Sequence, residues 1–355
     1  MTLLDRYILA GVLRGTVLVL TVLLVLNAFV SFIGQVDNVG QGTYTTADAV
    51  AFVLLTLPSM AYQLLPIATL LGALLGLGNL ASHSELIVMR AAGISPWRLT
   101  SSVIIAGGLI AVIGTALGEF IAPPAEQYAK RQRTMALHNQ LSMGQGQSGW
   151  IRDGNVVINI EQLMAGDRAG GIYVFTFDEK RELQSIVQAR TASFDDDGVW
   201  VLDDSRKTEF LNERLVATKG SQMAQSTTLS PELLGLSVVD PDVLASHGLF
   251  DYIKYLRRNG LDADSYIMAF WSRIATIVSI VIMAALALPF VFGPLRSTGT
   301  GQRMFVGILL GAAYFLVNRL TANSGAVFGL NPAVTAWLPT IALFLVTVAA
   351  LARVR

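Results

Sequence analysis

The stretch Val12–Val36, VLRGTVLVLTVLLVLNAFVSFIGQV, decides the class of fold to which this chain belongs. Crossing a bilayer takes about 20 predominantly apolar residues in a helix, and this stretch exceeds that length. Because lipid offers no hydrogen bonds to the backbone, such a segment must be helical. The run is too long for the apolar core of a cleavable signal and lacks an A-x-A site, so we expect an uncleaved first spanning helix.

Five further apolar runs reach or approach the same length, and a polar stretch of domain size separates the third run from the fourth. This three-plus-three layout predicts an integral membrane protein with six spanning helices and one water-facing domain. The five runs are Val50–Leu80, Leu99–Ile121, Ala269–Leu295, Met304–Leu320 and Ala333–Leu351.

Composition narrows the range of functions. Hydrophobic residues make up 53% of the chain and charged residues 14%, against about 25% charged residues in soluble domains. The formal net charge of zero argues against a nucleic-acid partner, which would favour a basic stripe. The absence of cysteine excludes disulfides and thiolate metal sites.

Sequence motifs for catalysis are missing as well. The chain has three histidines and contains no H-E-x-x-H, no G-x-S-x-G and no G-x-x-x-x-G-K-[ST], so we predict no catalytic residue, no metal site, no cofactor and no ATP site. The stretch Gly144–Gly149 matches G-x-G-x-x-G. It follows no predicted strand and opens no predicted helix, which indicates a flexible loop.

The distribution of basic residues predicts the orientation in the membrane. The loops Asp37–Asp48 and Thr321–Pro332 carry neither Lys nor Arg, whereas the opposite side is rich in arginine. The positive-inside rule therefore places both termini in the cytoplasm and the large polar insert outside, which in a bacterium is the periplasm. The arginines of the cytoplasmic side are Arg6, Arg14, Arg90, Arg98, Arg296, Arg303, Arg353 and Arg355.

The polar insert, residues 122–248, has the pattern of a β domain. Short runs rich in β-branched and aromatic residues alternate with turn signals such as Asp153-Gly154-Asn155 and Asp195–Gly198, which favours a sandwich, barrel or jelly roll. Leu249–Arg258 then has a helical pattern and should lie at the membrane surface before the fourth span. It could be a plain connection or a moving hinge. The predicted strands lie in Trp150–Ile160, Gly171–Phe177, Ile186–Phe194, Val199–Leu202 and Arg214–Thr218.

The loop between the second and third spans has the start and stop signals of a short helix. Ser82 and Glu85 have capping-box spacing, Gly93 is a favourable C-terminal stop, and Ser95-Pro96 begins the next helix. We therefore predict a short helix over residues 82–93 on the cytoplasmic face.

One face of this short helix is predicted to form an apolar knob. Leu86, Met89 and Ala92 can share that face, with Glu85 and Arg90 at its ends. Such a helix could dock into a groove on a cytosolic partner, or it could simply lie on lipid as an interfacial turn.

Several motifs, in chain order, resemble the lipopolysaccharide-export permeases, which are the paired membrane subunits of the Lpt ABC exporter of Gram-negative bacteria. They fit the LptG-like subunits better than the LptF-like ones, and the resemblance covers the whole chain. The motifs are Leu71–Gly78, Ser84–Gly93, Gly118–Pro123 followed by Glu126-Gln127, Asp240-Pro241-Asp242, Gly248-Leu249 with Tyr252–Leu256, and Phe292–Ser297.

The resemblance implies three parts and their roles. Residues 1–121 would hold spans one to three with a coupling helix at 82–93, residues 122–248 a periplasmic β-jellyroll, and residues 249–355 the interfacial helix and spans four to six. The chain would be a transporter subunit and not an enzyme, because a separate cytosolic subunit hydrolyses ATP. The residues implied to contact that ATPase are Ser84, Glu85, Leu86, Met89, Arg90 and Gly93, with Glu85 as the charged contact.

The resemblance also implies partners and a location. The chain would sit in the bacterial inner membrane beside an LptF-like sister permease, with an LptB-like ATPase dimer below and LptC-like and LptA-like jellyroll proteins above. The first and fifth helices of the two permeases would form lateral gates around a lipid-sized cavity.

Lipopolysaccharide carries phosphates and acyl chains, so its site needs an apolar wall and cations near the outer rim. Lys130 and Arg133 match a basic pair of the family, and their spacing puts both on one helical face; the alternative is a solvated charge cluster. Arg319, near the outer end of the gate helix, is a third candidate. The stretch Ser31–Asn38 has none of the lysines that the family often carries there.

Two other residues, Glu119 and Arg273, are predicted to lie near span ends, where snorkelling to the interface would explain them. Two alternative functions are also consistent with the sequence. One is a transmitter that couples a cytosolic ATPase mechanically to a periplasmic domain, although such chains usually have fewer spans. The other is a membrane anchor that recruits periplasmic partners through β-strand pairing.

Overall fold

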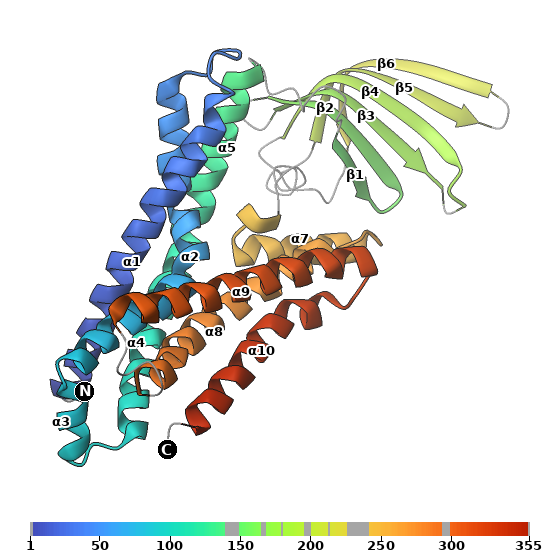
Figure 1. Cartoon of the computed structure of the whole chain (residues 1–355). Coiled ribbons are helices and arrows are strands. Elements are labelled where there is room, and N and C mark those ends of the chain that lie inside the picture. Colours follow the sequence, from blue (N-terminus) through green and yellow to red (C-terminus); the bar gives the residue numbers. More distant parts are fainter. Residues whose placement is uncertain are drawn as a thin grey trace.

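The computed structural model describes residues 3–138, 149–164, 168–178, 180–194, 200–211, 214–225, 241–292 and 299–353. Figure 1 shows a bundle of long helices with both termini and the short helix α3 (Glu85–Ala91) at one end. The β domain projects from the opposite end. The motifs Gly144–Ser148, Asp195–Gly198 and Gly293–Ser297 lie outside the described residues, as does Asp240.

Six helical segments are long and apolar enough to span a membrane, so the predicted fold class of membrane helices with a β insert is confirmed. The third span continues without a break through a π-turn into a helix that extends past the apolar run. The helices are α1 (Leu3–Val36), α2 (Thr46–Ser82), α4 (Pro96–Ala116), the π-turn η1 (Leu117–Ile121), α5 (Ala122–His138), α8 (Asp264–Phe292), α9 (Thr300–Phe328) and α10 (Pro332–Ala352).

Helix α2 is the centre of the bundle, and small residues let its neighbours approach closely. A methyl group added to Gly76 would lie 2.4 Å from the carbonyl oxygen of Gly11, and one added to Gly15 would lie 2.2 Å from that of Gly72. Two pairs of glycines with Gly-x-x-x-Gly spacing, Gly114 with Gly118 and Gly307 with Gly311, lie against side chains of α2, so they make contacts within the chain. Their neighbours are Leu65 for Gly114, Tyr62 for Gly118, Leu71 and Leu74 for Gly307, and Ile67 for Gly311.

The β domain is one antiparallel sheet whose described strands pair in chain order. The predicted β insert is confirmed, and its closure into a jellyroll stays a prediction. Alternate residues of the strands point to one face and are buried, as expected for a half-buried antiparallel sheet. Ile158, Ile172, Val187 and Trp200 belong to this buried face. The strands are β1 (Gly149–Asp153), β2 (Val156–Met164), β3 (Arg168–Phe177), β4 (Leu183–Phe194), β5 (Trp200–Leu211) and β6 (Arg214–Gln225).

A short 3-10 turn, η2 (Pro241–Val243), and the helix α7 (Ser246–Arg258) lead from the β domain to α8. Figure 1 shows α7 between the sheet and the helix bundle. The apolar side of α7, which includes Leu249 and Leu256, is buried. The predicted helix at Leu249–Arg258 is therefore present and begins three residues earlier.

Candidate functional site

Helix α3 is set off from its neighbours by two left-handed turn residues. Helix α2 continues to Ser82, whose hydroxyl donates to the carbonyl oxygen of Asn79 at 2.8 Å. The predicted capping box at Ser82 is therefore wrong, because this residue ends one helix instead of starting the next. Ser84 has φ 61° and Gly93 has φ 87°, and the conformation at Ser84 is uncommon for a residue with a side chain.

The two faces of α3 differ from the predicted knob. Leu86 is 4% exposed and belongs to the main hydrophobic core, and Met89 packs partly against that core. Val88 is instead 65% exposed, and Trp97, in the first turn of α4, is 78% exposed. Leu86 and Met89 thus pack inward, whereas Val88 of α3 and Trp97 of α4 are exposed apolar side chains.

Glu85, the predicted charged contact, is held by α1. The hydroxyl of Tyr7 donates to Oε2 of Glu85 at 2.9 Å. The side chain of Arg90 lies outside the described ones, and Ser84 and Gly93 are exposed. The first helix therefore touches the short helix directly.

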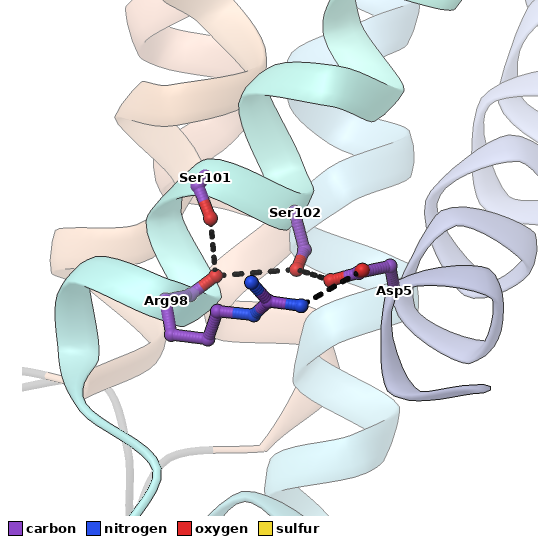
Figure 2. A network of polar contacts seen from close by, with 4 residues as sticks. All are labelled: Asp5, Arg98, Ser101 and Ser102. Atoms are coloured by element: carbon purple, nitrogen blue, oxygen red, sulfur yellow. Dashed lines mark hydrogen bonds and ion pairs between the residues drawn. The ribbon is translucent and has the colours of Figure 1, made fainter. Parts of the chain in front are cut away.

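A second contact joins α1 to α4, and sequence reasoning missed it. Figure 2 shows Asp5 of α1 facing Arg98 and Ser102 of α4. Nη2 of Arg98 donates to Oδ2 of Asp5 at 3.0 Å, and the Ser102 hydroxyl donates to Oδ1 at 2.7 Å. The Asp5 side chain is buried, so the pair satisfies a carboxylate that would be costly to bury alone.

The fifth span is attached at the same end of the bundle. Arg303, in the first turn of α9, is buried, and its Nη1 donates to the carbonyl oxygen of Gly78 at 2.8 Å. A side chain at Gly78 would collide with this guanidinium. Both α1 and α9 are thus connected to the segment α2–α3–α4 by polar contacts.

The predicted basic pair lies at the other end, on α5. Nζ of Lys130 pairs with Oε1 of Glu126 at 3.3 Å, one turn away. The Arg133 guanidinium carbon stands 5.5 Å from the ring centroid of Phe52 on α2, and its Nε is buried without a hydrogen-bond partner among the described residues. Arg133 is therefore a partly exposed cation whose Nε is buried and whose guanidinium makes a cation–π contact with Phe52.

The loop between α1 and α2 lies against the end of α5, near Arg133. The backbone N–H of Thr43 donates to the carbonyl oxygen of Ala136 at 2.7 Å, near the end of α5. Burial raises the pKa of Tyr44 above its ordinary value, while the positive charge of Arg133 acts in the opposite direction. The phenol thus stays neutral beside the cation.

The third predicted cation is not part of this cluster. Arg319 is exposed on α9, which packs mainly against α2, α8 and α10. Within one chain, then, Lys130 and Arg133 lie together on α5, whereas Arg319 lies on α9.

The two charged residues expected to snorkel are instead brought together. Nη1 of Arg273 on α8 lies 3.5 Å from Oε1 of Glu119 in η1, and both side chains are largely buried. Helix α2 contacts the same place, because the Tyr62 hydroxyl donates to the backbone carbonyl oxygen of Arg273 at 3.3 Å. No group of metal-ligating side chains is found among the described residues.

Comparison with known proteins identifies close relatives along the whole length. The family model described as lipopolysaccharide export system permease LptF/LptG matches residues 6–353. The chain is 36% identical to the lipopolysaccharide export system permease protein LptG of Escherichia coli K12, over 99% of this chain and 98% of that protein. It is 33% identical to LptG of Haemophilus influenzae, over 97% and 96% of the two chains. Identity to LptF of Escherichia coli K12 is 22%, over 97% and 92%.

Proposed function

This chain belongs to the LptF/LptG family of lipopolysaccharide export system permeases, and from that membership we propose that it is the LptG-like membrane subunit of an ABC exporter. The exporter extracts lipopolysaccharide from the outer leaflet of the inner membrane and passes it through periplasmic β domains toward the outer membrane. The observation that carries this proposal is the full-length match, which covers all six spans and the β domain together.

The proposed orientation puts both termini in the cytoplasm and the β domain in the periplasm. Two observations support it. Both termini lie at the same end as α3 (Figure 1), and Arg6, Arg98, Arg303 and Arg353 belong to segments at that end. A surplus of arginine is the usual property of the cytoplasmic side.

The coupling helix α3 would seat in a groove of a separate ATPase subunit, LptB-like and present in two copies. Its exposed apolar residue Val88 would enter such a groove, and the hydrogen bond from Tyr7 to Glu85 gives the contact a direct link to α1. A movement of α3 would reach α1 through this hydrogen bond and through the Asp5–Arg98 pair. Ser84 and Gly93 would act as the turns that set the helix angle.

Lipopolysaccharide would be held by its anionic groups at Lys130 and Arg133 of α5. The side chain of Arg133 is partly exposed beside Phe52, and its guanidinium would donate to a phosphate oxygen. Lys130 lies one turn away and adds a second positive charge. Arg319 would act at the gate formed with the LptF-like sister permease, with LptC-like and LptA-like proteins receiving the lipid.

Depletion of the protein in its native bacterium tests the function. If the chain is an exporter subunit, lipopolysaccharide should accumulate in the inner membrane, whereas a transmitter or membrane anchor should leave its distribution unchanged. Co-purification provides a second measurement: we expect one sister permease and two ATPase copies for each chain. A homodimer without the sister would contradict the proposal.

A further inference from the structure

Glu119 holds three groups from two other elements. It lies in the middle of η1, the π-turn where the third span passes into α5. Its Oε2 accepts the backbone N–H of Ser246 at 2.8 Å, its Oε1 accepts the Ser246 hydroxyl, and Arg273 of α8 forms the ion pair described above. Single π-turns inside α-helices are often associated with functional positions.

The carboxylate of Glu119 supplies the N-terminal cap that α7 lacks. The capping position of α7 is Ala245, which has no side chain able to accept a hydrogen bond. The first N–H groups of a helix need acceptors, and a carboxylate there is also favoured by the helix dipole. Glu119 fulfils both requirements from another helix. The amide of Gln127 on α5 adds a bond of 3.3 Å to the carbonyl oxygen of Val243, just before α7.

Along its length, α7 packs firmly on the start of α8. Leu249 contacts the cluster that includes Ala269, and Leu256 packs with Ala263. The rings of Tyr252 and Tyr266 are 4.7 Å apart. Burial is the main cause of the raised pKa of Tyr252, which keeps its hydroxyl neutral. Helix α7 and the first turns of α8 therefore form a rigid corner.

The far end of α7 is attached to the β domain. The Tyr255 hydroxyl donates to the carbonyl oxygen of Arg152 at 2.6 Å, and its ring packs against the buried face of the sheet. Oδ1 of Asn259 accepts the backbone N–H of Gly154 at 2.8 Å. Both contacts lie at the turn between β1 and β2. The helix of 13 residues thus bridges about 20 Å between the two parts of the molecule.

We propose that α7 is a strut that transmits movement of the third and fourth spans to the β domain, and that Glu119 is the positioning residue that joins the strut to the spans. The mechanical part of this inference rests on contacts within the chain. Its consequence for transport rests on the proposed export function. The β domain would follow the spans as they move because both ends of the strut are held by hydrogen bonds.

The absence of cysteine permits a direct test in the full complex reconstituted in nanodiscs. Spin labels placed at Lys219→Cys on β6 and Ala47→Cys at the start of α2 report the distance between the β domain and the bundle. We expect one narrow distance distribution for the otherwise unchanged chain. Glu119→Ala and Asn259→Ala should each broaden it, because they release opposite ends of the same strut. Asp251→Asn, an exposed carboxylate on α7, is the matched control and should change nothing.

Transport provides the second readout. In Glu119→Ala, lipopolysaccharide transfer to a soluble periplasmic acceptor, measured per ATP hydrolysed, should fall by about fivefold, the lower end of typical coupling between distant sites. Glu119→Gln retains an acceptor oxygen, so its distance distribution should be narrower and its transfer per ATP higher than in Glu119→Ala. If the alanine variant does not assemble, the glutamine variant provides both measurements. Distance distributions equal to those of Asp251→Asn in both Glu119 variants would overturn the strut. If the unchanged complex transfers no lipopolysaccharide, the export function is contradicted. The distance measurement would still test the strut by itself.

Discussion

Asp5 is 5% exposed in the first turn of α1, and its carboxylate is satisfied by Arg98 and Ser102. The same principle applies to the other charges beside the spans. Arg303 donates to a backbone carbonyl oxygen, and Arg273 faces Glu119. Charged groups in or near lipid are costly unless a partner compensates them. Each of these residues therefore acts as a specific connection between two helices.

The basic residues Lys130 and Arg133 of α5 are proposed to contact lipopolysaccharide. Reversing both charges (Lys130→Glu with Arg133→Glu) should lower lipopolysaccharide crosslinking to the purified complex by about tenfold, since one charge-assisted hydrogen bond contributes roughly 1.5 kcal/mol and about 1.4 kcal/mol corresponds to tenfold. Arg131→Glu is the control, because Arg131 is exposed on the same helix. Equal crosslinking in the two variants would show that the pair is only a solvated cluster.

Helix α2 shows how single elements organise the bundle. Glycines let the backbones of α1 and α2 approach each other directly, and glycines of α4, η1 and α9 make room for side chains of α2. Without a hydrophobic driving force between helices in lipid, such close packing is a main source of association. Both α1 and α9, the expected gates, therefore share close contacts with one central helix.

This packing can be tested with a pair of alanine substitutions. Gly72→Ala would place a methyl group 2.3 Å from the backbone of Thr16 and should destabilise the protein by about 1–3 kcal/mol. Gly11→Ala has nothing within 4 Å and should be neutral or stabilising by up to about 1 kcal/mol, because alanine favours helix. Thermal unfolding of the purified complex measures the difference. Similar midpoints for both variants would contradict the packing described.

The exposed face of the short helix α3 is proposed to bind the ATPase. Val88→Glu places a charge on its exposed apolar face and should weaken co-purification of the ATPase without lowering thermal stability. Leu86→Ala removes a core side chain and should destabilise the chain by roughly 2 kcal/mol or more. Leu215→Glu, an equally exposed position on β6, is the control for an added charge. If Val88→Glu retains the ATPase as well as Leu215→Glu does, the outer face of α3 is not the docking surface.

At the scale of the whole molecule, the helices separate the end that carries α3 from the end that carries the β domain. Both termini and α3 lie at one end, and the β domain lies at the other (Figure 1). Long helices connect them: α1 has 34 residues and α2 has 37, which at 1.5 Å per residue exceeds the roughly 30 Å of bilayer hydrocarbon. Movement at one end can therefore be carried to the other by rigid elements.

The orientation is open to a labelling experiment on single-cysteine variants. Lys219→Cys on the β domain and Gln41→Cys in the α1–α2 loop should react with a membrane-impermeant maleimide in intact spheroplasts. Ala92→Cys, next to α3, should react only after lysis. All three positions are exposed, so a difference in labelling reports the side of the membrane. Labelling of Ala92→Cys in intact spheroplasts would reverse the proposed topology.

The sequence by itself determined the number and order of the spans, the place of the β domain and the position of the short helix between the second and third spans. These features follow from local patterns, such as the apolar run Val12–Val36 and the turn at Gly154, which nearby residues specify. The full-length resemblance to a family was also visible in motif order.

Only the tertiary structure decided which residues meet. Leu86 was expected on the outer face of its helix, but packing of α3 against the bundle turned it inward. Asp5 and Arg98 are separated by 93 residues, and Glu119 and Ser246 by 127. Such pairs depend on how helices cross, and no periodicity within one segment contains that information. The connections that would carry movement from α3 to α1, and from the spans to the β domain, are therefore properties of the folded chain.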